Sequence, residues 1–576
     1  MSNDIIKQYM MNFSVEELKT FLGQDLVESL LEWNSENEAL VSKKKLSEMI
    51  ICVYGSGILK NKNFRKRLMK SFSKEDILSF RKVLPIEYQD CTDLEVIIDY
   101  TSNRSWRNTP INSYFVRMLS YNPEKIFEKA NEDETPTELI ESYDKFYELL
   151  DYQYVIRQRA LNILNSNYDL RRFLIHMPTG TGKTKTATHI VCHHYNYNLK
   201  KKGLILWIAH TKELLQQAHD TFVSVWRNIG NGNINIYKLW GEHDIDIPAS
   251  SFNGFMICGI QKMQAIQSNN EELFNAILRA TRLVVYDEAH KASATETRDL
   301  IEKLMNRSGN LEDRALMGLS ATPGRTTTIS FDNDLLVSMF GNKIIGIDTT
   351  LMNAVNMSAQ EAANVEVETD VVKYFQDRGV LSKIEKEELT YTKKLTDNEL
   401  EKIKITTYSQ GYEDFSKKAL ETIGKNKNRN LVILKRLKEL YYEGKPTIVF
   451  ACSVQHAQLL SAMLTLNNIE NAAVIGKMPS GERKDAIERF KDKKDKLNIL
   501  INYEVLTTGF DATNIECVFI ARPTQSVVLY SQMLGRGLRG PQMGGNESCL
   551  LIDVKDNLEQ YNENMAFSHF NNYWRT

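Results

Sequence analysis

The sequence predicts an α/β protein with two tandem parallel-sheet domains, preceded by a helical N-terminal domain and separated by a helical connector. Residues 1–145 show the helical spacing of apolar positions. From about residue 146, short runs rich in Ile, Leu and Val alternate with helical stretches, and this alternation resumes after about residue 431. Such runs are typical of parallel strands that are buried on both faces. The stretch between the two blocks, 351–430, is charged and predicted to be mainly helical.

Length and composition limit the classes of protein to consider. A chain of 576 residues is long enough for roughly three to four domain-sized units. The net charge of −2 excludes a strong positive field over the whole molecule, so any nucleic-acid contact must come from a local groove. The seven cysteines are scattered and form no C-x-x-C pair, which favours a reducing compartment over a disulfide framework or a zinc ribbon. With neither a signal peptide nor a membrane span expected, we predict a cytoplasmic protein.

The helical domain, residues 1–145, begins with a clear helix signal. Apolar residues recur at i, i+3, i+4 and i+7 within 14–34, and Ser14 followed by Glu17 resembles a capping box. The acidic run 131–139, which contains a proline, is predicted to be a linker. The basic run 60–70 is more simply a solvated helix face, and the alternative is a contact with DNA or a protein partner.

The two sheet domains are predicted at 146–350 and 431–576, with the connector at 351–430. The strands expected in the first are 173–177, 203–210, 255–260, 282–288 and 315–322. Those expected in the second are 446–452, 471–476, 497–504, 517–523 and 549–554.

A glycine-rich loop, PTGTGKT, follows the first strand and precedes a helical stretch, which is the setting that a phosphate-binding loop requires. Its glycines allow backbone N–H groups to approach phosphate oxygens, and the following helix N-terminus adds its positive end. Lys183 is expected to reach the β- and γ-phosphates of ATP, and the Thr184 hydroxyl to bind Mg²⁺. Met177 stands where the general pattern has its first glycine. We expect the nucleotide to contact Thr179, Gly180, Thr181, Gly182, Lys183 and Thr184.

Two adjacent carboxylates end the strand VVYDE at 284–288. In an open parallel sheet, ligands bind beyond the carboxyl ends of the strands, so these acids are expected to face the nucleotide. Asp287 is predicted to hold Mg²⁺, and Glu288 to orient and deprotonate the attacking water.

Six ordered segments together resemble the motifs of the superfamily-2 helicases, over about residues 150 to 556. They are GTGKT at 180–184, DEAH at 287–290, SAT at 320–322, VFACSVQHA at 449–457, VLTTGFDATNI at 505–515 and QMLGRGLRG at 532–540, which look like motifs I to VI. The resemblance implies two RecA-like lobes that bind ATP between them.

The last two motifs imply how the second lobe completes the site. Motif VI would place Gln532, Arg536 and Arg539 at the cleft, and the two arginines share one face if the segment is helical. Arginines supplied from a facing domain stabilise the charge of a transferring phosphoryl group. In the family, motif V links nucleotide and nucleic acid, which implies roles for Gly509 and Asp511.

Other segments resemble the nucleotide-base and strand-binding elements of the family. YVIRQRA at 154–160 looks like the adenine-reading element, with Gln158 as the expected reader. AHTKELLQQA at 209–218 looks like motif Ia, and GIQK at 259–262 like the next element, on a face that touches the phosphate backbone. The nucleic-acid contacts expected are Thr211, Lys212, Gln261, Lys262 and Thr507.

The resemblance favours DNA over RNA as the substrate. Motif VI has the form Q-x-x-G-R-x-x-R, which with GLSATPGR at 318–325 resembles the branch of type I and III restriction subunits, RadD and XPB. DEAD-box RNA helicases usually carry histidine where Gln532 stands. We therefore expect an ATP-dependent DNA helicase or translocase, within a bacterial restriction, anti-phage or repair complex.

Two alternatives stay open. The chain could be an ATP-driven switch or loader whose helical domain docks a protein partner, for example a separate nuclease or effector. It could instead remodel RNA.

Overall fold

The computed structural model describes most of the chain. It covers residues 2–33, 42–127, 136–142, 148–166, 171–241, 243–248, 251–292, 294–305, 314–322, 330–347, 370–392, 406–409, 412–476, 478–506, 512–524 and 526–555.

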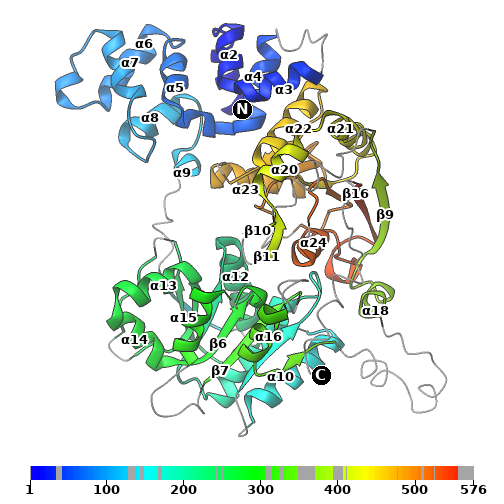
Figure 1. Ribbon diagram of the computed structural model, residues 1–576. Coiled ribbons are helices and arrows are strands. Elements are labelled where there is room, and N and C mark those ends of the chain that lie inside the picture. Colours follow the sequence, from blue (N-terminus) through cyan, green and yellow to red (C-terminus); the bar gives the residue numbers. More distant parts are fainter. Residues whose placement is uncertain are drawn as a thin grey trace.

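The helical domain was predicted at residues 1–145; in the structure its helices lie within 2–127, drawn in blue in Figure 1, and Thr137–Ile140 is instead a strand of the first sheet. The expected capping box is present at its second helix: Glu17 N donates to Ser14 Oγ at 3.1 Å, and Ser14 N to Glu17 Oε2 at 2.7 Å. The helices and 3₁₀ turns are α1 Ser2–Met10, α2 Val15–Leu22, α3 Gln24–Trp33, α4 Lys43–Tyr54, η2 Gly55–Lys60, α5 Lys62–Met69, α6 Lys74–Ser79, η3 Phe80–Lys82, η4 Ile86–Tyr88, α7 Leu94–Ser102, α8 Pro110–Met118 and α9 Pro123–Ile126.

The basic run 60–70 is not simply a solvated face, because one of its arginines is in the core. Arg65 is 1% exposed, and its guanidinium donates to the carbonyls of Leu59 at 2.6 Å, Ser102 at 2.6 Å and Arg104 at 2.7 Å. Neighbouring charges in the run form ion pairs inside the same domain, namely Lys66–Asp99, Arg67–Glu17 and Lys70–Glu95. Arg65 is therefore a core residue of the helical domain, which corrects the expectation of a solvated face at that position. The alternative of a contact with DNA or a protein partner stays a prediction for the exposed members of the run.

The first lobe, residues 137–347, contains an eight-stranded sheet in the order β1-β4-β5-β3-β6-β7-β2-β8, parallel except that β1 is antiparallel to β4. Helices cover both faces (Figure 1). The strands are β1 Thr137–Ile140, β2 Arg172–His176, β3 Leu204–Ala209, β4 Ile234–Leu239, β5 Gly254–Gly259, β6 Thr281–Asp287, β7 Ala315–Ser320 and β8 Ile344–Ile345. The helical elements are α10 Asp151–Leu164, α11 Lys183–His193, the π-helix η5 His194–Asn198, α12 Lys212–Ile229, α13 Ile260–Asn269, α14 Glu271–Ala280, η6 Ala289–Lys291, α15 Thr295–Met305 and α16 Ser330–Met339.

The second lobe contains a six-stranded, wholly parallel sheet in the order β13-β14-β12-β15-β16-β9. Its strands are β9 Lys383–Leu389, β12 Thr447–Phe450, β13 Ala472–Val474, β14 Ile499–Asn502, β15 Cys517–Ile520 and β16 Ser548–Val554. The helical elements of this half are α18 Val371–Asp377, α20 Lys417–Gly424, α21 Lys427–Tyr442, α22 Val454–Leu466, α23 Ser480–Lys491, α24 Val527–Leu534 and η8 Pro541–Met543. The two RecA-like lobes and the helical N-terminal region are thus confirmed.

The connector is not purely helical, which corrects the prediction for 351–430. Its residues 383–389 form β9, which pairs in parallel with β16 along all seven residues and so belongs to the second sheet. A hairpin follows, made of β10 Thr406–Ser409 and β11 Tyr412–Phe415. It is fixed to the second lobe through Asp414, which accepts from Arg522 at 2.7 Å and from Thr524 at 3.1 Å.

Two apolar cores join the parts of the chain. One core contains residues of α2, α4 and α5 together with residues of α21, α22 and one face of the second sheet, so the helical domain and the second lobe share it. The other contains residues of the first lobe, of α18, and of the opposite face of the second sheet. In the part of the chain that the structure describes, no helix is long and apolar enough to cross a lipid bilayer.

Replacing Arg65 by Met should destabilise the helical domain by about 3 kcal/mol, because three carbonyls would lose a charged donor in the core. The melting temperature of the full chain measures this. Lys66→Met is the matched control, since the Lys66–Asp99 pair lies at the surface and should contribute little. Equal melting temperatures for the two variants would contradict a structural role for Arg65.

Candidate active site and nucleic-acid face

The phosphate loop lies between β2 and α11, as its sequence predicts. Gly180 and Gly182 have φ angles of +89° and +79°, which only glycine adopts without strain. Thr181 donates its hydroxyl to Pro178 O at 2.7 Å, which closes the loop on itself. Lys183 begins α11, so its backbone N–H and those of the next residues belong to the orphan donors of a helix N-terminus.

The loop is held from outside by the first turn of α10. The Tyr152 hydroxyl donates to Thr181 O at 2.8 Å, and Gln153 Nε2 donates to the same carbonyl at 3.0 Å. A Cβ on Gly182 would lie 2.4 Å from Gln153 Nε2, so the amide rests against the loop backbone. Gln158, which the sequence predicts to contact the adenine, lies five residues further along α10 and is half-buried. Sequence reasoning missed Tyr152 and Gln153, although a Tyr-Gln pair at the start of a helix before the loop was a usable signal.

The two carboxylates of DEAH lie at the end of β6, where Asp287 is buried and the Glu288 side chain is 12% exposed. Asp287 is 2% exposed, and burial raises the pKa of its carboxyl group, while the nearby ammonium of Lys183 counteracts that rise. Burial alone would also raise the pKa of Glu288, but the positive charges of Lys183, Lys291 and Arg536 hold it below its usual value. Glu288 has a φ of +56°, a left-handed conformation that is uncommon outside glycine, asparagine and aspartate. Burial thus raises the pKa of Asp287, while the surrounding positive charges lower that of Glu288.

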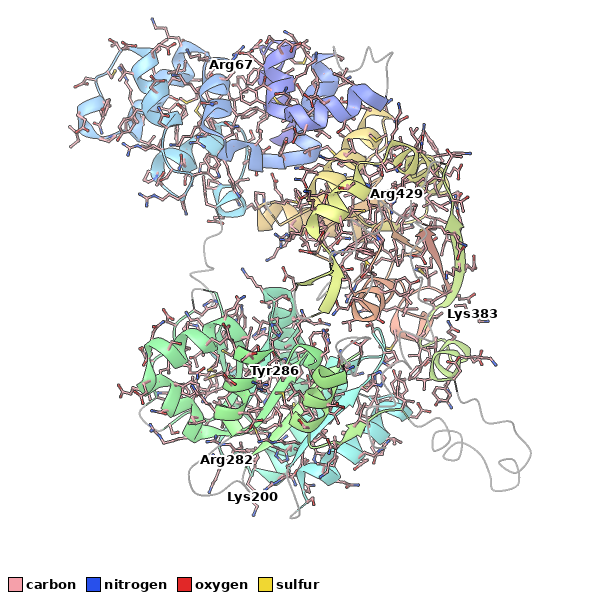
Figure 2. All side chains as sticks on the ribbon, in the orientation of Figure 1. Arg67, Lys200, Arg282, Tyr286, Lys383 and Arg429 are labelled. Atoms are coloured by element: carbon pink, nitrogen blue, oxygen red, sulfur yellow. The ribbon has the colours of Figure 1, made fainter. Side chains whose placement is uncertain are left out.

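Buried histidines connect this strand end to its neighbours. His290 Nδ1 lies 3.2 Å from Ser320 Oγ at the end of β7 and 3.4 Å from Glu288 Oε2. Tyr286 Oη lies 2.6 Å from His210 Nε2, which joins β6 to the segment after β3. Figure 2 labels Tyr286 within the first lobe. These contacts tie the carboxylate segment to the SAT segment and to the start of α12.

Motif VI closes over the phosphate loop from the second lobe. A Cβ on Gly535 would lie 2.5 Å from Thr179 Cβ, so the motif VI backbone packs against the Thr179 side chain with no space for a side chain at position 535. Arg536 carries a positive charge close enough to Glu288 to shift its pKa. Gln532 is 5% exposed, and its Nε2 is a buried donor with no hydrogen-bond partner among the residues that the structure describes. Arg539 packs its Cγ against Gly180, 3.5 Å from where a Cβ would lie. The structure therefore brings Arg539 to the loop and Arg536 close to Glu288.

The residue types here suit Mg²⁺, which prefers oxygen ligands and binds through one or two carboxylates plus substrate phosphates. The Asp287 carboxylate and the Thr184 hydroxyl at the start of α11 supply such oxygens. Among the described residues, no group of three or more His, Cys, Asp or Glu side chains is arranged to hold a metal by itself.

The expected nucleic-acid contacts of the first lobe lie at two neighbouring strand ends. β3 and β5 are parallel with Ala209 opposite Gly259, so the N-termini of α12 and α13 emerge at one edge of the sheet. Thr211 caps α12, accepting from Leu214 N at 3.3 Å. Lys262 is paired with Asp244 at 2.7 Å. The side chains of Lys212 and Gln261 are exposed. Thr507, Gly509 and Asp511 lie outside the described residues.

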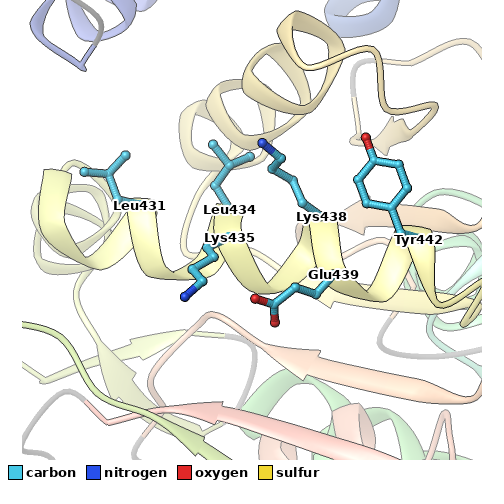
Figure 3. Close-up of a pocket in the computed structure, with 6 residues that line it drawn as sticks. All are labelled: Leu431, Leu434, Lys435, Lys438, Glu439 and Tyr442. Carbon is cyan, nitrogen blue, oxygen red and sulfur yellow. The ribbon is translucent and has the colours of Figure 1, made fainter.

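A groove of about 340 Å³ lies on the outer side of α21, away from the site (Figure 3). Leu431 and Tyr442 line it and are 40% and 74% exposed. None of the predicted site residues lines this groove.

Two family models match the chain. The model of the type III restriction enzyme res subunit matches residues 146–325, and the helicase conserved C-terminal domain matches residues 429–540.

Individual proteins are similar over a larger part of the chain. IRC3 of Saccharomyces cerevisiae, described as an ATP-dependent helicase, is 24% identical over 414 residues, which is 70% of this chain and 51% of that protein. The type I restriction enzyme EcoAI endonuclease subunit of Escherichia coli is 24% identical over 409 residues, 68% of this chain and 44% of that protein. The matched region is thus about half the length of these relatives. A fragment of an HsdR subunit of a type I restriction enzyme from Vibrio vulnificus is 19% identical, with a TM-score of 0.45 over 82% of this chain and 74% of that one.

Replacing Gln153 by Ala should raise the KM for ATP about fivefold, because the loop loses one buried hydrogen bond of about 1 kcal/mol. Gln158→Ala is the matched control on the same helix and should leave the KM close to that of the unmodified chain. Steady-state ATPase kinetics measure both. A larger effect at Gln158 than at Gln153 would support the expectation that Gln158 contacts the adenine.

Proposed function

Because the chain belongs to superfamily 2 of the helicases, in the branch that contains restriction-enzyme subunits, we propose that it is an ATP-dependent DNA translocase or helicase. The observation that carries the proposal is the meeting of the phosphate loop, the two acids and the motif VI arginines at one place between two parallel sheets.

In the proposed reaction, water attacks the γ-phosphorus of ATP, and ADP and phosphate are released. Lys183 binds the β- and γ-phosphates, Glu288 orients the water and accepts its proton, and Arg536 and Arg539 stabilise the charge that develops on the phosphoryl oxygens. Mg²⁺ held by Thr184 and Asp287 would neutralise phosphate charge. The Gln532 amide, a buried donor in the same cleft, supplies a further hydrogen bond to a phosphate oxygen.

Closure of the lobes is the step that couples this chemistry to movement. ATP draws the arginines of the second lobe toward the first, and hydrolysis releases them. Strand contacts at Thr211, Lys212, Gln261 and Lys262 on one lobe and at Thr507 on the other would change their spacing in each cycle. From their place in motif V, we propose that Gly509 and Asp511 link the binding of nucleotide to the binding of nucleic acid.

DNA is favoured as the substrate by the relatives and by motif VI. One similar protein and one matching family model are named for restriction-enzyme subunits, and DNA is the substrate of restriction enzymes. Gln532 stands where DEAD-box RNA helicases usually carry histidine. We propose a place in a bacterial restriction, anti-phage or repair complex in the cytoplasm.

A switch or loader in such a complex is the second candidate. It is supported by the shared core of the helical domain and the second lobe, because a partner bound to that domain would follow each movement of the lobe. A strand-displacement assay distinguishes the two candidates, since DNA-stimulated ATP hydrolysis without displacement favours the switch.

Glu288→Gln should lower kcat by about 10²- to 10⁴-fold and leave ATP bound, because the amide keeps the shape of the side chain and cannot accept the proton. Single-turnover hydrolysis and nucleotide binding measure the two effects. Glu296→Gln, on the exposed face of α15, is the control and should turn over normally. Rapid hydrolysis by the Glu288 variant would refute its role as the base.

The substrate is tested by the ATPase rate with single-stranded, duplex and forked DNA and with RNA. We expect DNA to stimulate turnover, with a stimulation that weakens as salt rises because the contacts are mainly to phosphates. Stimulation by RNA and not by DNA would refute the proposal and favour RNA remodelling.

A further inference from the structure

Residues 370–382, between the lobes, were predicted only as part of a connector. They comprise α18, a turn at Gly379 with a φ of +64°, and the residues that lead into β9. The Asp370 carboxylate caps the helix, accepting from Val372 N at 2.9 Å. Phe375 is fully buried in the core that contains residues of both lobes. This segment, which we call the strap, is fixed at its start and along its length.

On the side of the second lobe, the strap is bonded to the backbone that carries motif VI. Gly540 N donates to Val380 O at 2.9 Å, and Ser382 N donates to Leu538 O at 2.9 Å. The Ser382 hydroxyl donates to Arg539 O at 2.6 Å. These bonds lie on both sides of Arg539 in the chain, so the strap fixes where that arginine is held.

On the side of the first lobe, the strap contacts the start of α10. The ring of Phe375 lies 4.8 Å from the ring of Tyr152, centroid to centroid, at an interplanar angle of 70°. Arg378 forms an ion pair with Asp151, and its guanidinium lies 4.4 Å from the centroid of the Tyr374 ring. Tyr152 is the residue whose hydroxyl holds the phosphate loop.

The contacts form a continuous path from the phosphate loop to the arginine of the other lobe. It runs from Thr181 through Tyr152 to Phe375, and from the strap backbone to Arg539. Coverage of an apolar core would need only the buried side chains of the strap. The Arg378–Asp151 pair adds nothing to that coverage, because its side chains are 30% and 36% exposed. The Arg378–Asp151 ion pair instead joins the strap to α10 at the surface, and we call this pair the latch.

We propose that the strap sets the position of the motif VI arginines against the nucleotide, and that Arg378 is a positioning residue for the reaction. This inference rests on the proposed ATP hydrolysis. When bound nucleotide fixes the positions of the loop and α10, the strap in turn fixes the position of Arg539. The ion pair between Arg378 and Asp151 keeps the strap, and with it the second lobe, in place against α10 of the first lobe.

The first test is the kinetics of the full chain with Arg378→Ala. We expect kcat to fall roughly three- to tenfold, because the variant loses one partly exposed ion pair. The KM should change less, and the melting temperature should stay the same. Arg378→Lys keeps the charge and should recover most of the rate. Asp377→Asn, an exposed neighbour on the same helix, is the matched control and should equal the unmodified chain. An unchanged kcat in Arg378→Ala would overturn the proposal.

Asp151→Ala and the double variant with Arg378→Ala test whether the two residues act as a pair. The double variant should be no slower than the slower single variant. Effects that multiply would show independent roles and would overturn the latch.

A measurement that needs no hydrolysis separates this proposal from the proposed function. A non-hydrolysable ATP analogue should slow amide hydrogen exchange in 379–382 of the unmodified chain, and much less so in Arg378→Ala. Such slowing in a chain that does not hydrolyse ATP would support the strap and refute the ATPase. Equal slowing in both chains would refute the strap whatever the turnover.

Discussion

The close packing of the Gly535 backbone against the Thr179 side chain is the constraint on which the candidate site depends. A side chain at position 535 would overlap Thr179, so motif VI can lie against the phosphate loop in this way only with glycine there. The loop is itself held by hydrogen bonds from Tyr152 and Gln153 of α10. The position of α10 therefore determines where the loop, and the motif VI segment packed against it, can lie. In the first lobe, the loop and the two acids follow the carboxyl ends of parallel strands, where open α/β sheets bind their ligands.

Much of both sheets could be predicted from the sequence because most strands of a parallel sheet are buried on both faces. The expected strands at 173–177 and 315–322 correspond to β2 and β7 within two residues. β4 was missed because polar residues interrupt its apolar pattern. Its Lys238 is nevertheless 3% exposed, since the ammonium pairs with Glu138 of β1, a partner that sequence periodicity does not reveal. β9 was missed for the opposite reason, because its charged residues are exposed at the sheet edge.

The order of the motifs indicated the site more reliably than any single residue did. Lys183, Asp287 and Arg536 lie far apart in the chain, yet in the structure the charge of Lys183 acts on Asp287, and those of Lys183 and Arg536 act on Glu288. Gln158 has the residue type expected of an adenine contact, whereas Gln153, nearer the start of α10, is the glutamine that contacts the loop. Arg65 shows the limit of charge patterns, since a basic run does not reveal which member points into the core. The role of the strap could not be predicted from the sequence, because contacts between distant segments produce no periodic pattern of apolar residues.

The shared core of the helical domain and the second lobe has a consequence for how such chains diverge. Most residues of α22 are buried, because the sheet lies on one side of this helix and α4 and α3 on the other. Glu482 of α23 accepts two bonds from Ser56 N, at 2.9 and 3.0 Å, so the junction is also specific in its polar contacts. A homologue without the helical domain would therefore need polar side chains on the outer face of its α22. The composition of that one helix would record whether a relative has gained, lost or exchanged the domain, even where the domain itself is too divergent to align.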